Sequence, residues 1–173
     1  KAGAGLFVHT AAEKGRFYYA VTIVADGREA AGGVAALAEP VAEDPAEPEP
    51  VLQGDLPAGP YWDYPATRKH YVQWCGPPDT ANRPSVAYSY GVSVPAAPPE
   101  GSMPMEVHFP SMGFSYYRPS MRVRTDSVVV VPYDHPTPSG HYGYHECLGT
   151  LKSWRRGVVR NYTERRLLAM LAP

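Results

Sequence analysis

Four consecutive valines, Val128 to Val131, constrain the fold of this chain more than any other feature. A short β-branched run between turn residues is typical of a strand that is buried on both faces, as in a parallel sheet. We therefore expect strands at residues 105–109 and 127–131. The loop that leaves the first strand, residues 108–117, is rich in Ser, Gly and Tyr. Because open α/β sheets carry their ligand sites at the carboxyl ends of central strands, function is expected in this loop.

Composition narrows the classes of protein to consider. The chain has 173 residues and a formal net charge of −1, so it lacks the broad basic field that a nucleic-acid partner requires. No run of about 18 apolar residues is present, and no membrane span is expected. The 20 prolines argue against a mostly helical chain. The 13 tyrosines suit half-exposed sheet faces and interfaces, since each combines a ring with a hydroxyl.

Residues 1–38 read as a β-meander, with strands expected at 5–10, 16–25 and from 28 towards 37. Asp26-Gly27 predicts a tight hairpin turn, because both residues tolerate positive φ. The stretch GLFVHTAAEKGRFYYAVTIVADGRE resembles the last three strands of a fibronectin type III domain, in which a Tyr-rich strand precedes a tight turn and the closing strand. Such a domain has about seven strands, so the resemblance implies only a partial module.

Residues 39–50, EPVAEDPAEPEP, are acidic and rich in proline. They show no apolar periodicity, and we expect them to be an extended, solvated linker between two domains. The second domain would then comprise residues 51–173. Within it, residues 51–65 are expected to be mostly turn and loop, and residues 70–75 and 85–94 alternate in polarity and predict an antiparallel strand pair.

The clearest helix signal lies near the end of the sequence. Asn161 is a suitable N-cap, and Glu164 stands at the position of its reciprocal partner. The expected helix continues over residues 165–172. Leu167, Leu168 and Leu171 are expected on its apolar face, and Arg165 and Arg166 on the solvent side.

Two antiparallel strands, a strand–loop–strand unit with a valine-rich core and a capped helix together resemble the opening of an α/β-hydrolase domain. The stretch VVVVPYDHPTPSGHYGYHECLGTLKSW, continued by VVRNYTERRLLAML, is similar to exported esterases and peptidases of that superfamily. The expected fold is thus a mixed, β-rich α/β chain: a partial fibronectin III-like meander followed by the first strands and helix of a hydrolase-type sheet. The resemblance implies an oxyanion loop after the third strand, with four candidate residues: His108, Ser111, Met112 and Gly113.

The nucleophile elbow of that family, Gly-x-Ser-x-Gly, does not occur in these 173 residues. The resemblance therefore implies the front part of an exported serine-hydrolase-type esterase or peptidase, in an extracellular or periplasmic setting, without a catalytic residue of its own. It would be an enzyme only when completed by the remainder of a longer chain or by a second cleaved chain. The alternative is a non-catalytic structural or interaction protein that assembles through its sheet edges, with itself or with a partner.

Other side chains around the valine strand are candidates for binding. Ring stacking in a substrate cleft is expected of residues that flank the predicted strand ends: Tyr116, Tyr117, Tyr133, His135, His141, Tyr142 and Tyr144. No cofactor is expected; a metal held by His141 and His145 is a weak alternative, because the turn residues around them disfavour a shared helical face. Ser111 and Ser115 could act as nucleophiles only beside a base.

Two further groups of residues leave alternatives open. Arg155, Arg156 and Arg160 could bind an anion or form a solvated approach to the helix. Cys75 and Cys147 are either two buried thiols or one disulfide of an exported protein, and their spacing excludes a CxxC motif.

Overall fold

The computed structural model describes residues 8–30, 32, 34–45, 49–57, 65–77, 79–83, 85–110, 115–117, 123–134 and 139–171. They divide into two compact units, of which one is Thr10–Ala46 and the other contains the rest of the chain. The described residues are β-rich, with several small sheets and one short helix near the C-terminus. The expected mixed, β-rich composition is thereby confirmed.

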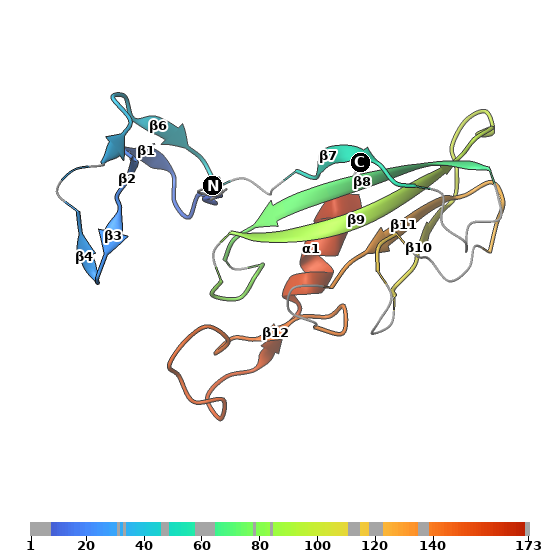
Figure 1. Cartoon of the computed structure of the whole chain (residues 1–173). Helices are drawn as coiled ribbons and strands as arrows, with labels where there is room; N and C mark the ends of the chain where they lie inside the picture. The colour runs from blue at the N-terminus through green and yellow to red at the C-terminus, as the bar shows by residue number, and fades with distance from the viewer. Residues whose placement is uncertain are drawn as a thin grey trace. The chain divides into compact units, whose positions relative to one another are not determined.

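The unit Thr10–Ala46 is a long two-stranded hairpin (Figure 1). Three antiparallel strand pairs follow one another along it. β1 (Gly15–Phe17) pairs with β6 (Val41–Glu43), β2 (Ala20–Val21) with β5 (Ala35–Ala36), and β3 (Val24–Ala25) with β4 (Arg28–Glu29). The hairpin turns at Asp26 and Gly27, whose φ angles are 50° and 74°. Both residues thus adopt the left-handed conformation of a type I′ turn, as the sequence predicts.

The hairpin corrects two expectations. Residues 8–10 of the first expected strand are not in a strand, and residues 5–7 lie outside the described part of the chain. The expected linker contains β6, which is paired with β1 because Val41 lies opposite Phe17 and the Glu43 carboxylate accepts a hydrogen bond from the Tyr19 hydroxyl. Lys14 and Asp44 extend the pairing by an ion pair of 2.6 Å. Two acidic residues of the segment, Glu43 and Asp44, are therefore partners within the hairpin.

The larger unit contains a five-stranded sheet in the order β10-β11-β9-β8-β7 (Figure 1). From β7 to β11 the strands are Val51–Asp55, Ala66–Cys75, Val86–Pro95, Met105–Val107 and Val128–Pro132. All neighbours are antiparallel except β10 and β11, which are parallel. The structure confirms the expected antiparallel pair, β8 with β9, and the buried valine strand, β11.

The sheet also differs from expectation in one place. β7 occupies residues that were expected to be loop, and it pairs with β8 through an irregularity between Leu52 and Gly54. The valine strand β11 is paired on both sides, with β9 on one and β10 on the other. Among the described strands, β10 and β7 form the two edges of this sheet.

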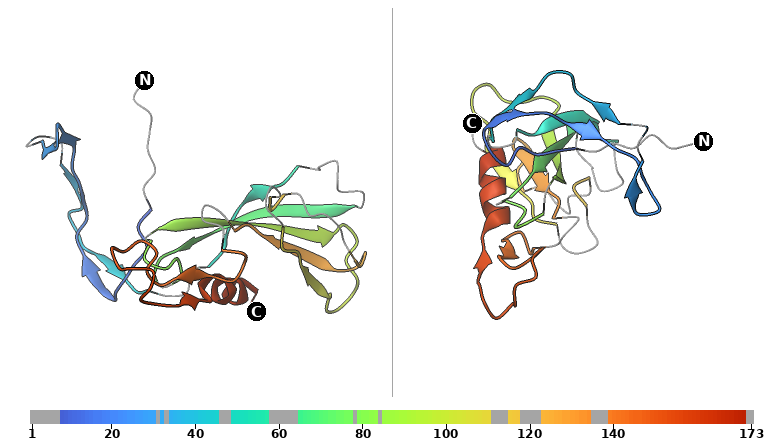
Figure 2. Two further views of the ribbon diagram at one scale, coloured as in Figure 1. Left: turned by 90° about the horizontal axis from the view of Figure 1, so that it is seen from below. Right: turned by 90° about the vertical axis from the view of Figure 1, so that its left-hand side faces the viewer.

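Helix α1, Tyr162–Leu171, lies across one face of the sheet (Figures 1 and 2). The core beneath it contains Cys75, Tyr88, Tyr90 and Leu167. The helix faces this core with Thr163, Arg166 and Leu167, spaced by three and four residues as on one helical face, whereas Leu168 is 63% exposed. The expectation that Arg166 faces solvent and Leu168 the core is therefore wrong.

Arg166 is buried because the sheet offers it partners other than water. Its Nη1 donates to the Tyr90 hydroxyl at 2.7 Å, and its guanidinium carbon lies 3.4 Å from the centroid of the Tyr88 ring. The Tyr90 hydroxyl in turn donates to Gln73 Oε1 at 2.7 Å. A cation over an aromatic face is stabilised most strongly when it is desolvated. The tyrosine-rich strand β9 thereby supplies the binding surface for a charged helix residue.

The two cysteines are free and buried, so the disulfide alternative is wrong. Burial raises the pKa of the Cys75 thiol to about 12, against an opposing effect of Arg166. A thiol with such a pKa stays protonated and unreactive at neutral pH.

The N-terminus of α1 begins where the sequence predicts it. Asn161 O accepts from Arg165 N at 3.0 Å, and Asn161 Nδ2 donates to Glu164 Oε2 at 2.8 Å. The Glu164 backbone N–H donates to the Tyr142 carbonyl at 3.0 Å. One of the unpaired donors of the first helical turn is therefore satisfied by the preceding loop. Before the helix, two short strands, β12 (Tyr144–His145) and β13 (Val159–Arg160), form an antiparallel pair.

Candidate functional site

The parallel strands β10 and β11 bring two loops to the same edge of the sheet. His108 N donates to Val130 O at 2.8 Å, directly after β10. At the other end of the pair, Val128 N donates to Pro104 O at 2.9 Å. Residues 108–110 and 133–134 therefore leave the carboxyl ends of neighbouring parallel strands, which is where open sheets carry ligands.

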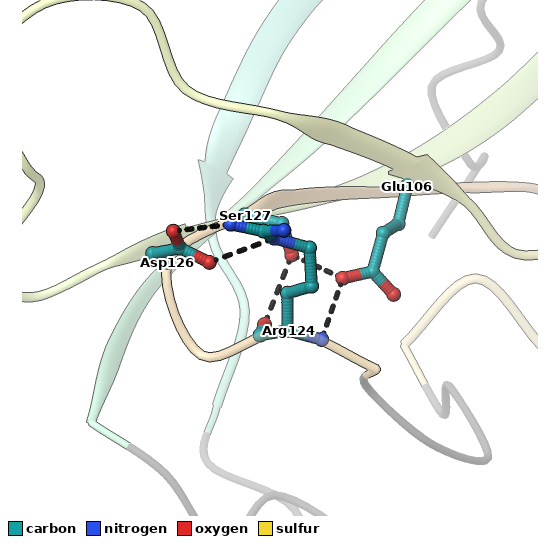
Figure 3. Close-up of polar contacts among 4 residues, drawn as sticks. All are labelled: Glu106, Arg124, Asp126 and Ser127. Carbon is teal, nitrogen blue, oxygen red and sulfur yellow. Dashed lines mark hydrogen bonds and ion pairs between the residues drawn. The ribbon is translucent and has the colours of Figure 1, made fainter.

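The return of the chain into β11 is held by Glu106 on β10 (Figure 3). Its carboxylate accepts hydrogen bonds from Val123 N at 3.0 Å, from Arg124 N at 2.9 Å and from the Ser127 hydroxyl. Arg124 forms a two-pronged ion pair with Asp126, at 3.0 Å and 2.8 Å. Glu106 thus fixes the end of the crossover, the connection that leads from β10 to β11. The side chains of the Arg124–Asp126 pair are exposed.

Asp134, two residues after β11, organises the next loop. Its Oδ2 accepts from Ser139 N and, at 3.1 Å, from His141 N, and its Oδ1 accepts from the Ser139 hydroxyl at 2.8 Å. An aspartate that accepts several backbone N–H groups stabilises a turn that the backbone alone would not favour. His141 accordingly adopts a φ of 59°, which is uncommon for a residue other than glycine.

His141 lies against the loop that leaves β10. Its Nε2 is 3.2 Å from the Pro110 carbonyl oxygen, and its ring centroid is 5.0 Å from that of Phe109. Since a carbonyl only accepts hydrogen bonds, Nε2 is the nitrogen that donates to Pro110. Nδ1 is buried and has no hydrogen-bond partner among the described residues. The site therefore contains a buried imidazole nitrogen that is open to a hydrogen-bond partner.

The sheet face opposite α1 carries a cluster of aromatic rings. Tyr116 stacks on His70 with ring centroids 4.6 Å apart, and its ring also meets those of Tyr117 at 5.4 Å and Tyr133 at 5.6 Å. The Tyr116 carbonyl lies directly over Gly91 of β9, where a Cβ would stand 2.1 Å from its oxygen. The absence of a side chain at Gly91 therefore lets the crossover pack onto the sheet.

Burial governs the titration of the histidines and tyrosine near this edge. It lowers the pKa of His70, whose Nε2 is 3.1 Å from the Ser89 hydroxyl. It also lowers the pKa of His108, against an opposing effect of the Glu106 charge. It raises the pKa of Tyr116, and the neighbouring Tyr117 adds to the increase. Both imidazoles are consequently neutral at physiological pH.

The predicted site residues fall into four groups. Ser111, Met112, Gly113 and His135 lie outside the described residues, so their predicted roles stay predictions. Tyr116, Tyr117 and Tyr133 come together in one ring cluster, and His108 and His141 belong to the two loops at the strand ends.

Tyr142 and Tyr144 have other surroundings. Tyr142 is exposed, and its carbonyl accepts a hydrogen bond from the Glu164 backbone N–H at the helix N-terminus. Tyr144 is buried, with its hydroxyl 3.1 Å from that of Tyr88, and so it packs in the core under α1.

The structure does not bring His141 and His145 to one metal site. His145 Nδ1 accepts from Cys147 N at 3.2 Å, and its ring lies 4.8 Å from that of Trp154. The described part of the chain contains no group of three or more His, Cys, Asp or Glu side chains arranged to hold a metal ion.

Ser139 is not arranged as a nucleophile either. The Ser139 hydroxyl lies between Asp134 Oδ1 and Thr163 Oγ1, at 2.8 Å and 2.6 Å, and no imidazole hydrogen-bonds to it. It links the Asp134 turn to the helix and is not beside a base.

His70 and Glu106 are the residues that sequence reasoning missed. His70 belongs to the aromatic cluster only through the register of β8 against β9, in which it lies opposite Gly91. Glu106 is recognisable only once β10 is paired with β11, since its partners are 17 to 21 residues away. No local pattern signals either residue.

Comparison with protein-family models, with curated proteins and with solved structures gives no match. Among the residues that the structure describes, no helix has both the length and the apolar character needed to cross a bilayer.

Proposed function

We propose that this chain is the front part of an exported serine-hydrolase-type esterase or peptidase, which needs further polypeptide to become active. The observation that carries the proposal is the parallel pair β10–β11, which follows the antiparallel pair β8–β9 and precedes α1. This is the succession of elements that the hydrolase resemblance implies. In that family the loop after the third strand supplies an oxyanion donor, and here the corresponding loop begins at His108.

The two loops at the strand ends support this reading by their chemistry. Backbone N–H groups of residues 111–113 are the proposed oxyanion donors, since acyl transfer needs donors directed at the developing negative charge. The buried Nδ1 of His141 is a proposed acceptor for a polar group of the substrate or of the completing polypeptide. The exposed rings of Phe109 and Tyr117 are proposed to contact the substrate.

The experiment that tests the proposal compares two products of the encoding gene. A fluorophosphonate probe, which labels activated serines, is expected to label a longer product that contains a downstream Gly-x-Ser-x-Gly and to leave the 173-residue chain unlabelled. A stop codon directly after Pro173 would refute the proposal. Ester hydrolysis by the 173-residue chain that a serine-directed phosphonate abolishes would refute its dependence on further polypeptide.

The second candidate function is a non-catalytic interaction protein, and the hairpin favours it. Its large apolar side chains are mostly exposed, among them Tyr18, Val21, Ile23, Val24, Val34 and Leu37. An apolar surface of this kind is typical of a contact face for another chain. Sedimentation equilibrium of the 173-residue chain separates the two candidates, because self-association that is lost on replacing Val21 and Ile23 by Ser would favour the interaction role.

A further inference from the structure

The loop between β12 and β13, residues 146–158, is a compact excursion from the larger unit (Figures 1 and 2). Its ends are joined by the strand pair and by a hydrogen bond from Glu146 N to Val158 O at 3.1 Å. Asn82 Nδ2 fastens it to the rest of the unit by donating to the carbonyls of Glu146 and Leu148, at 2.9 Å and 3.0 Å. Loops of this length with close ends are frequently functional.

The interior of the loop is built around Cys147. The buried Sγ of Cys147 donates to Arg156 O at 2.8 Å and to Ser153 O at 3.4 Å. Two turns close next to it, from Thr150 N to Cys147 O at 3.0 Å and from Arg156 N to Ser153 O at 2.9 Å. These contacts hold the backbone of the loop around the Cys147 side chain.

The outer surface of the loop combines apolar and cationic side chains. Every residue from 151 to 160 is exposed, with Leu151 at 108% and Trp154 at 59% of full exposure. Lys152, Arg155 and Arg156 stand among them, and no described carboxylate pairs with any of the three. The loop acid, Glu146, is paired with Arg160 at 3.0 Å. A hollow of about 1180 Å³ adjoins these residues, and its lining includes Leu151, Lys152, Arg155 and Arg156.

We infer that residues 151–156 form a docking surface for an anionic lipid membrane. A fully exposed leucine beside a tryptophan suits the boundary between headgroups and acyl chains, where Trp is enriched. The three unpaired cations complement the negative surface of anionic lipids. A nucleic acid would use the cations but would leave Leu151 in water, and the chain has no wider basic field. The inference does not depend on the proposed hydrolase function.

The test is co-sedimentation of the full chain with phosphatidylcholine vesicles that contain or lack phosphatidylserine. Binding is expected only with phosphatidylserine and is expected to weaken as salt is added. R155Q/R156Q should weaken it by about 25-fold, since each basic residue near such a surface contributes about fivefold. L151A should weaken it by about tenfold or more through lost apolar burial.

Two control variants match these changes elsewhere in the chain. R16Q/R28Q removes two exposed arginines from the hairpin, and L168A removes an exposed leucine from α1. Neither control is expected to alter vesicle binding. In a separate measurement, brominated lipid should quench tryptophan fluorescence in the wild type, and W154F should lose that quenching.

Three results would overturn the inference. The first is absence of binding to phosphatidylserine vesicles. The second is binding that the loop variants and the control variants change equally. The third is binding of a labelled oligonucleotide that R155Q/R156Q abolishes while vesicle binding is absent, which would identify a nucleic acid as the partner.

Discussion

Gly91 is the residue at which a single methyl group should displace the crossover between β10 and β11. A Cβ at this position would lie 2.1 Å from the Tyr116 carbonyl oxygen and 3.1 Å from its carbonyl carbon. Both atoms belong to the backbone, so no side-chain rotation can relieve the contact. In the Gly91→Ala variant either residues 115–117 move away from the sheet or β9 shifts.

The magnitude follows from the size of this overlap. Carbon and oxygen atoms of neighbouring groups are rarely closer than about 3 Å, and overpacking of this kind typically costs about 1–3 kcal/mol. Because Tyr116 also stacks on His70 at 4.6 Å, its displacement loses an aromatic contact worth about 0.5–1.5 kcal/mol. We therefore expect Gly91→Ala to lower the free energy of unfolding by about 2–4 kcal/mol. For a chain of this size the melting temperature should fall by about 2–4 °C for each kcal/mol.

Urea and thermal unfolding of Gly91→Ala and Gly32→Ala provide the assay and its control. A Cβ at Gly32 meets no atom within 4 Å, so this variant should remain within about 0.5 kcal/mol of the wild type. NMR titration of His70 gives a local measurement, because its lowered pKa should rise towards the ordinary value of 6.5 once Tyr116 no longer covers the ring. If Gly91→Ala is as stable as Gly32→Ala and the His70 titration is unchanged, the proposed packing of the crossover is refuted.

Three further predictions follow from the buried charge, the crossover and the histidines. Arg166→Met should change the free energy of unfolding by less than about 1 kcal/mol, since none of the ion pairs among the described residues includes Arg166, whereas Arg166→Ala should lower it by about 2–4 kcal/mol through the cavity; chemical denaturation of both variants shows whether the shape or the charge of this side chain stabilises the fold. Glu106→Gln should lower stability by about 1–2 kcal/mol because an amide group then faces backbone N–H donors, while Arg124→Ala, which removes an exposed ion pair, should differ little from the wild type. Below pH 6.5 the unfolded chain takes up a proton that the partly buried His70 of the folded chain does not, so this contribution to stability should be complete above that pH and fall beneath it; a smaller fall in His70→Gln would confirm the assignment, and an equal fall would contradict it.

Elements whose signals are local were predictable from the sequence. The turn at Asp26 and Gly27 depends only on the tolerance of these two residues for positive φ. The pair β8–β9 and the buried strand β11 follow from alternation and from the valine run. The start of α1 follows from the residues around Asn161. In each case the chemistry that determines the element lies within a few residues of it.

Arg166 and β7 were not predictable because distant partners determine them. A charged helix residue is normally solvated, and Arg166 becomes a core residue only because Tyr88 and Tyr90 lie beneath it, 76 to 78 residues earlier in the chain. β7 contains Gly54 and has little strand character by itself. It forms because the long strand β8 offers it an edge to pair with.

The location of the candidate site could be predicted from the sequence, but the arrangement of its side chains could not. The valine strand and the loop before it indicate the sheet edge at which function is expected. The contact of His141 with Pro110 spans 31 residues and depends on the turn that Asp134 organises. Whether a histidine after the strand faces the site or the solvent depends on that turn and is not encoded in spacing alone.

The helix connects the core of the larger unit to this site. Arg166 and Leu167 anchor α1 on the sheet, and the first turn of the same helix holds the loop that carries His141. Thr163, fully buried, lies 2.6 Å from the Ser139 hydroxyl, and Glu164 N donates to the Tyr142 carbonyl. Because His141 lies between these two anchored residues, the helix holds the backbone that carries its ring beside Pro110. The loop that carries the buried Nδ1 is therefore held in place by a helix whose phase is set by a buried arginine.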